Sequence, residues 1–372
     1  TGVAVGLVLI ALGSGALKAN ASSLLGTLYA EGDPRRDGGF TLFYLGINLG
    51  AFIGPLITGL LQTHLGFHYG FGAAAIGMAL GLAQYVAFRR NLGEHGRTVP
   101  HPLSHKEFWR MAAAAAVVVA VVVIAFLVGV IKLANLSQVT TGIIVVASIG
   151  YFAVMLNSPK VDALERTRVR AFIPLFIANA VFWSLFQQIF TVLAVYSDER
   201  MNWSIFGWTA PSNWIGSIEP VWIILLSPLF ALMWTKLGRR APTTPRKFAY
   251  GVIGMGVAFL LFLPMAATTG RTVPALVVMA IMAVFALSEL MLSPIGLSVT
   301  TQLAPNAFRA QMMALYFFSV GLGTAMSGVL ARYYDEEHEF AYFGILGVAA
   351  IVVGLVGWGL APRISRLREG GH

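Results

Sequence analysis

The stretch VPALVVMAIMAVFALSELMLSPIGLSV, residues 273–299, carries a single charged side chain, Glu289. A run of roughly 20 mainly apolar residues is long enough to cross the hydrocarbon core of a bilayer as a helix. Its apolar residues do not alternate with polar ones, as they would in a membrane-spanning barrel strand. We therefore expect a transmembrane helix here, with a carboxyl group inside the membrane.

Ten further stretches of the same kind fill most of the chain. They are Gly2–Tyr29, Phe40–Thr63, Phe67–Phe88, Met111–Ile131, Thr140–Leu156, Phe172–Tyr196, Trp214–Trp234, Phe248–Ala267, Met312–Ala331 and Phe340–Leu360. The sequence therefore predicts an all-α polytopic membrane protein with eleven transmembrane helices. The composition agrees, since only 11% of the residues are charged, against about 25% in a soluble domain. This excludes a soluble enzyme of ordinary construction, and the absence of Cys excludes a disulfide scaffold.

The basic residues test this count of helices. If the helices alternate in direction, 20 of the 25 Lys and Arg residues fall on one side of the membrane and four on the other, with Lys18 inside a span. Basic residues favour the cytoplasmic side. We expect the side with 20 charges to be cytoplasmic, and it includes the C-terminus. The net charge of +9 then reflects orientation in the cell membrane and not binding to nucleic acid.

Two of the predicted helices divide the chain. Met111–Ile131 and Thr140–Leu156 have almost no polar side chains and are expected to lie at the periphery. The sequence predicts an N-terminal group of three helices in residues 1–90, a connector with two additional helices in residues 91–170, a six-helix bundle in residues 171–362 and a cytoplasmic tail in residues 363–372. The chain opens almost inside a helix, so we expect a fragment that lacks upstream helices; the alternative is an unusual but complete protein.

Charged residues inside membrane spans are rare and mark sites or cavities. Lys18, Glu219 and Glu289 are the three that lie well within the predicted spans. A weak repeat places Lys18 and Glu289 on corresponding helices, where opposite charges suit a zwitterionic solute; a structural ion pair is the alternative. Glu219 and Glu289 are also candidate proton carriers.

Prolines inside the predicted spans indicate broken helices. Pro55, Pro220, Pro228 and Pro294 each remove a backbone donor. Because Pro220 directly follows Glu219, we expect unwound backbone beside that carboxyl group, of the kind that lines a cavity.

Several stretches resemble one family of transporters. FYLGINLG, residues 43–50, resembles the FYxxINxG signature of proton-dependent oligopeptide transporters, a branch of the major facilitator superfamily. Residues 13–20 with residues 33–37 are similar to the lysine-bearing helix and loop before that signature, and residues 182–188, 217–220 and 288–294 are similar to parts of its seventh, eighth and tenth helices. The resemblance implies the major facilitator superfamily fold, with helices four to six, two inserted helices and helices seven to twelve present. It also implies that the first three helices, with their ExxER element, are absent.

The resemblance assigns roles to residues. It implies that Lys18 lies near the peptide carboxylate and that Glu289 receives the peptide amino group. The other residues that it implies for the substrate pocket are Tyr44, Asn48, Trp183, Tyr316 and Ser319. Many members carry glutamate where this chain has Gln187, and asparagine where it has Glu219. We hypothesise that Glu219 replaces the lost carboxylate, where it pairs with the arginine of the absent first helix or binds the peptide ammonium group, so Glu219 is also a candidate substrate-binding residue. The residues implied for proton coupling are Lys18, Gln187, Glu219 and Glu289.

The resemblance implies a monomeric symporter, not an enzyme, that imports di- and tripeptides by alternating access. Its partners would be small peptides, protons and the lipid bilayer, and the proton gradient would drive it without a cofactor. The alternatives are a transporter of another small solute on the same scaffold, such as an amino-acid conjugate, an anion or a drug, or an inactive fragment. No HExxH motif or other metal-ligand spacing occurs in the sequence.

Overall fold

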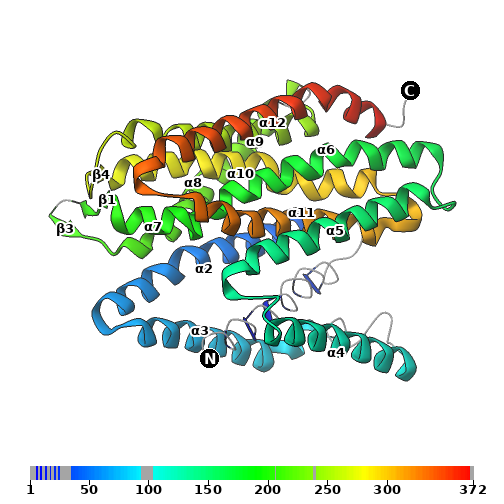
Figure 1. Cartoon of the computed structure of the whole chain (residues 1–372), viewed down its shortest axis with the longest axis horizontal. Helices are drawn as coiled ribbons and strands as arrows, with labels where there is room; N and C mark the ends of the chain where they lie inside the picture. Colours follow the sequence, from blue (N-terminus) through cyan, green and yellow to red (C-terminus); the bar gives the residue numbers. More distant parts are fainter. Residues whose placement is uncertain are drawn as a thin grey trace. The chain divides into compact units, whose positions relative to one another are not determined.

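The computed structural model describes residues 35–93, 104–205, 207–237 and 240–368, with single positions before residue 26. The described helices are α2 (Arg35–Leu65), α3 (Phe67–Phe88), α4 (His105–Leu127), α5 (Leu136–Asn157), α6 (Ala163–Phe186), α7 (Val192–Glu199), α8 (Ile215–Leu237), α9 (Thr244–Leu260), α10 (Ala275–Leu303), α11 (Arg309–Leu330) and α12 (Glu339–Arg368) (Figure 1). Short strands join loops at one end of the bundle. Parallel β1 (Met201–Asn202) and β4 (Val273–Pro274) form one pair, and antiparallel β2 (Ser204–Ile205) and β3 (Trp208–Thr209) form the other.

Ten of the eleven predicted spans overlap a described helix. The first, Gly2–Tyr29, lies largely outside the described residues. Within the part of the chain that the structure describes, nine helical segments are long and apolar enough to cross a membrane, and α4 is not among them. The prediction of an all-α polytopic membrane protein is confirmed, whereas the number eleven stays a prediction.

The chain divides into two compact units. One consists of Thr1–Gly50 and Leu60–Val123, and the other of Ala51–Gly59 and Ile124–His372. The second unit therefore holds α5 to α12 together with a short piece of α2 and the last turn of α4. The predicted domain boundaries after residues 90, 170 and 362 stay a prediction.

Helix packing in the second unit depends on small residues and phenylalanine. In Figure 1, α9 lies along α12. At their crossing, a Cβ atom added to Gly256 would lie 2.6 Å from the carbonyl oxygen of Gly347, so the two backbones are in contact. Large buried side chains fill the interior around this crossing, and Phe259 and Phe262 both contact Phe343. The bundle is a tightly packed frame for the polar residues it contains.

The prediction that the membrane helices are broken at their prolines is wrong. Helix α2 is continuous through Pro55, and α8 is continuous through Pro220 and Pro228; α10 likewise continues past position 294. A proline removes one backbone donor, and a membrane helix tolerates this loss while its remaining turns stay bonded.

The interruption occurs instead between α6 and α7. A 3-10 turn over Gln187–Phe190 is followed by Thr191, whose φ of −121° and ψ of −93° are not helical. The predicted span Phe172–Tyr196 is therefore two helices in sequence, joined at a polar turn.

Several helix ends differ from the predicted ones because polar caps, and not hydropathy, set them. Helix α6 begins nine residues before Phe172 at a capping box, in which the Glu165 amide donates to Asp162 (2.7 Å) and the Asp162 amide to Glu165 (3.3 Å). Helix α4 begins six residues before Met111 and ends at Leu127, shortly before Gly129 at φ +80°. Helix α12 extends past Leu360 to Arg368.

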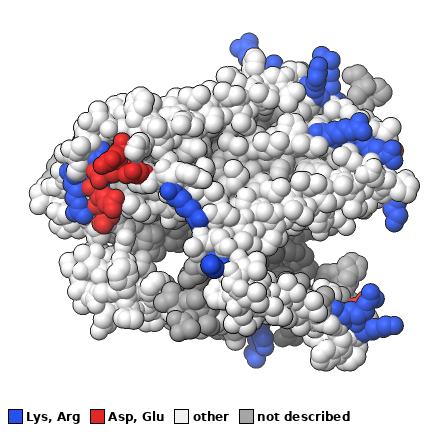
Figure 2. All heavy atoms as spheres, viewed as in Figure 1, with Lys and Arg blue, Asp and Glu red and all other residues white. Residues whose placement is uncertain are grey.

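Charge is distributed unevenly along the second unit. On the face shown in Figure 2, acidic side chains gather at the end where α7 ends and α12 begins. Lys and Arg side chains gather at the opposite end, where α6 begins and α12 ends. Which of these two ends faces the cytoplasm stays a prediction.

Candidate functional site

Two carboxyl groups from different helices meet inside the second unit. Glu219 on α8 and Glu289 on α10 are in hydrogen-bonding contact with each other. Glu219 is buried, and its Oε1 atom has no hydrogen-bond partner. Ser293, one turn further along α10, donates a long hydrogen bond of 3.4 Å to Oε1 of Glu289. An acidic group with an unsatisfied oxygen is thus held in the middle of two apolar helices.

Tyr316 on α11 lies beside this pair. Its side chain interacts electrostatically with Glu289 and is buried. The tyrosine ring occupies the space that Gly296 leaves on α10, because a Cβ atom there would lie 2.5 Å from the ring. Glycine at position 296 therefore sets how closely Tyr316 approaches α10.

Ser319, three residues after Tyr316 on α11, takes part in two buried hydrogen bonds. Its hydroxyl donates to the Tyr316 carbonyl (2.6 Å) and accepts from Nδ2 of Asn179 on α6 (2.6 Å). Both side chains are almost completely buried. The link fixes α11 against α6, and direct contact between Ser319 and a substrate stays a prediction.

Trp183 and Gln187 lie next to the break between α6 and α7. The Trp183 ring makes edge contacts with Phe182 and Phe186, and its Nε1 atom is buried with no hydrogen-bond partner. Gln187 donates from Nε2 to Thr324 on α11 (3.1 Å). Sequence analysis missed Asn179, the partner of Ser319, and Thr324, the partner of Gln187, although Asn179 stands out as a lone amide in an apolar helix.

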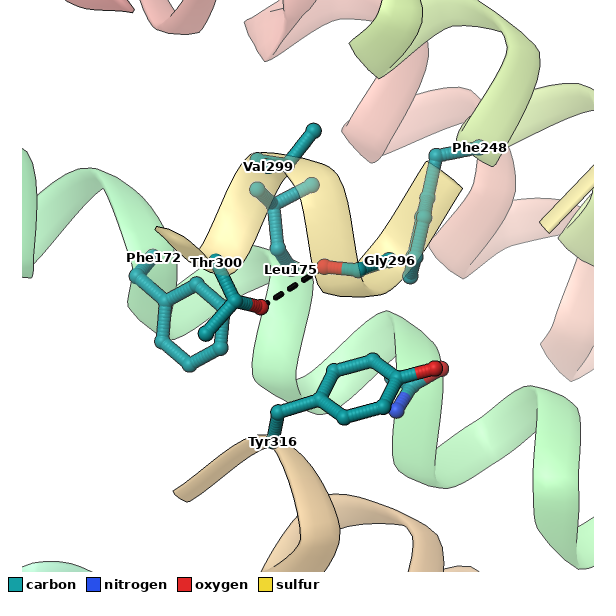
Figure 3. Close-up of a pocket in the computed structure, with 8 residues that line it drawn as sticks. Phe172, Leu175, Phe248, Gly296, Val299, Thr300 and Tyr316 are labelled. Atoms are coloured by element: carbon teal, nitrogen blue, oxygen red, sulfur yellow. Dashed lines mark hydrogen bonds between the residues drawn. The ribbon is translucent and has the colours of Figure 1, made fainter. Parts of the chain in front are cut away.

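A small cavity lies between α6, α9, α10 and α11 (Figure 3). It measures about 10 Å³, which is room for one water molecule at most. The Thr300 hydroxyl on its wall donates to the Gly296 carbonyl (2.7 Å), and Oδ1 of Asn179 is buried without a partner. This cavity is a packing gap beside Tyr316 and is too small to hold a peptide.

A larger cavity of about 490 Å³ lies elsewhere in the same unit. Part of its wall comes from the Ala51–Gly59 segment of α2. Four tryptophans also line it: Trp203, Trp208, Trp214 and Trp222. None of the described side chains that line it is charged.

The remaining predicted site residues cannot be placed around this pair. Lys18 lies outside the described residues. Tyr44 is on α2, but its side chain is outside the described part of the chain, and Asn48 on α2 is buried. Both α2 residues belong to the first unit.

Comparison with known proteins identifies the family. The family model described as the POT family matches residues 2–346. The chain belongs to the POT family. A protein of Bacillus subtilis (strain 168) named as an uncharacterised transporter, YclF, is 40% identical over 369 residues, covering 98% of this chain and 75% of that protein. A di-/tripeptide transporter of Lactococcus lactis subsp. cremoris is 37% identical over 365 residues, covering 95% of this chain and 73% of that protein.

Solved structures give the same result for the fold. A crystal structure of a mutant peptide transporter in complex with alafosfalin matches with a TM-score of 0.92 at 45% identity, covering 99% of this chain and 76% of that one. This POT family chain therefore has the major facilitator superfamily fold. Like the family it belongs to, it is a multi-pass membrane transporter and not an enzyme.

Proposed function

We propose that this chain imports di- and tripeptides together with protons by alternating access. The carboxyl pair of Glu219 and Glu289 inside the bundle carries the proposal. A negative group in the membrane needs a positive partner, and the amino group of a peptide supplies one. The relationship to a di-/tripeptide transporter at 37% identity supports peptides as the solute.

The remaining site residues complete the proposal. Lys18 pairs with the peptide carboxylate. Five uncharged residues contribute to substrate binding: Tyr44, Asn48, Trp183, Tyr316 and Ser319. Because fixed charges bind only the two ends of the peptide, the side chains between them are free to vary.

Uptake of labelled dialanine into liposomes tests this function. The protein is expressed from its complete reading frame, reconstituted and given an inward proton gradient, with and without a protonophore. Accumulation that depends on the gradient and collapses with the protonophore is the expected result. A folded preparation that accumulates no dialanine contradicts peptide symport and directs the search to another small solute on the same scaffold.

The proposal also includes the orientation of the chain in the membrane. We place the C-terminus of α12 in the cytoplasm of the cell, because Arg363 and Arg366 near that end add to the basic side of the membrane. Residues 1–372 contain no Cys, so an introduced thiol is the only one in this part of the protein. In intact cells, an impermeant thiol reagent is expected to label Glu337→Cys and not Arg366→Cys; the reverse pattern inverts the topology.

A further inference from the structure

The contact between Glu219 and Glu289 needs a proton, which two ionised carboxylates do not supply. An ionised carboxylate only accepts hydrogen bonds, whereas the two groups are in hydrogen-bonding contact. Two negative charges in hydrogen-bonding contact also repel strongly in a medium of low dielectric constant. One proton between the two carboxyl groups satisfies the contact and leaves the pair with a single negative charge.

No cation in the described part of the chain neutralises that charge. Neither glutamate forms an ion pair with a described Lys, Arg or His. Glu219 keeps only 7% of its surface exposed, and its Oε1 atom is buried without a partner. The pair therefore presents a buried acceptor oxygen, and the chemistry that complements it is a hydrogen-bond donor with a positive charge.

Among the described residues, the neighbouring elements add one titratable group beside the pair. Tyr316 on α11 faces Glu289, and Ser293 on α10 itself is neutral. Helix α9 meets α10 through glycines that pack on Ser288. The Ala51–Gly59 segment meets α8 through the hydrogen bond from Ser217 to the Phe52 carbonyl (2.8 Å). The Tyr342 hydroxyl of α12 donates to Oε1 of Gln188 in the turn after α6 (3.1 Å).

We propose that Glu219 and Glu289 hold one proton between them and that this shared proton is the one coupled to peptide import. The inference rests on the proposed function and names the proton-carrying group for it. Gln187 cannot take this role, because its side chain is neutral and donates to Thr324.

The charges balance through one transport cycle. When the pair is open to the outside, it takes one proton from the medium and carries one negative charge, which the peptide ammonium group neutralises. When the pair is open to the inside, the peptide leaves and the proton passes to the cytoplasm. Two ionised carboxylates then remain, and they take up the next proton before the next peptide is bound.

Glu219→Gln separates binding from coupling. The variant keeps the shape of the side chain and leaves Glu289 to bind the peptide, so exchange of labelled for unlabelled dialanine is expected to continue. Proton-driven accumulation is expected to be lost, whereas one coupled proton supports about tenfold accumulation per pH unit of gradient in the parent protein. Glu337→Gln, a change from acid to amide at an exposed loop residue, is expected to match the parent in both assays.

The assay has two outcomes that overturn the inference. Undiminished proton-driven accumulation by Glu219→Gln shows that the coupled proton is carried elsewhere. Loss of exchange in a variant with unchanged thermal stability shows that Glu219 is a peptide ligand and not a coupling group.

Infrared spectroscopy observes the shared proton directly, without transport. A protonated carboxyl group has a C=O stretch separate from that of a carboxylate. The parent protein is expected to show this band at neutral pH, and both Glu219→Gln and Glu289→Gln are expected to lose it. Absence of the band from the parent, or its persistence in both variants, overturns the shared proton. A parent protein that shows the band but does not accumulate dialanine keeps the pair and refutes the proposed function.

Discussion

Arg200 and Glu339 form a two-point ion pair at one end of the bundle. Nε of Arg200 donates to Oε1 of Glu339 (2.9 Å) and Nη2 donates to Oε2 (3.1 Å), and each residue is only 1% exposed. The guanidinium also donates to the backbone carbonyls of Met265, Thr268 and Gly270. One buried side chain thus joins the end of α7, the loop before α10 and the start of α12.

Removing one partner of this pair is expected to destabilise the protein strongly. Glu339→Gln leaves the guanidinium charge of Arg200 buried without its main counter-ion, which costs about 3–5 kcal/mol of the free energy of unfolding. Thermal unfolding in detergent measures the effect as a lower midpoint.

The matched control for Glu339→Gln is an exposed pair. Arg271 and Asp198 lie 3.7 Å apart with side chains 67% and 66% exposed. Such pairs contribute about 0–1 kcal/mol, so Arg271→Gln is expected to leave the midpoint almost unchanged. Equal shifts in the two variants would contradict the structural role of Arg200.

Alkaline pH is expected to weaken the contacts around Arg200 and Glu339 through Tyr334. Its hydroxyl donates to Oε1 of Glu339 (2.8 Å). Burial raises the pKa of Tyr334, and the hydrogen bond to Glu339 raises this pKa further. The unfolded tyrosine ionises at about pH 10. The stability from the raised pKa is therefore complete below that pH and is lost as the pH rises through the folded value.

Tyr334→Phe tests this dependence on pH. The variant is expected to be less stable than the parent at neutral pH by about 1 kcal/mol, the net value of a hydrogen bond. The difference in unfolding midpoint should shrink as the pH is raised above about 10. A difference that stays constant up to that pH and beyond would show that Tyr334 contributes only by packing.

Hydropathy alone predicted where the chain forms membrane helices, because lipid requires long apolar stretches. It predicted their ends poorly, since the start of α6 depends on the capping pair Asp162 and Glu165. It also misplaced the interruption, because a proline is visible in the sequence whereas the turn at Gln187–Phe190 is not marked by one.

The site was predictable residue by residue but not as an arrangement. A charge in an apolar span marks Glu219 and Glu289 individually, and their contact depends on how α8 packs against α10. Arg200 was counted only as one of four basic residues on the outer side, because nothing local distinguishes it from an exposed arginine. The carbonyls that surround it come from a loop more than sixty residues away.

Gly323 is expected to be essential for the contact of α11 with α6. A Cβ atom there would lie 2.6 Å from both the Ala180 carbonyl oxygen and Cβ of Trp183. Because the backbone cannot move aside, Gly323→Ala is expected to cost about 1–3 kcal/mol of stability and to weaken dialanine binding by displacing Trp183. Gly359→Ala on α12 has no neighbour within 4 Å and is expected to be neutral or stabilising by up to about 1 kcal/mol. Equal thermal midpoints for the two variants would contradict the close approach of α11 to α6.

Trp183 and Trp222 differ in whether the indole N–H has a partner. Nε1 of Trp222 donates to the Met279 carbonyl (2.8 Å), whereas Nε1 of Trp183 is buried without one. Trp222→Phe removes this hydrogen bond and is expected to lower the thermal midpoint, at a cost of about 0.5–1.5 kcal/mol. Trp183→Phe removes a donor that has no partner in the peptide-free protein, so its midpoint should be unchanged or higher. If the bound peptide accepts from that N–H, dialanine affinity falls by about two- to tenfold, the value of one hydrogen bond. Binding titrations and thermal unfolding of the same preparations separate the two effects. Unchanged affinity in Trp183→Phe with a lowered midpoint would make Trp183 a packing residue.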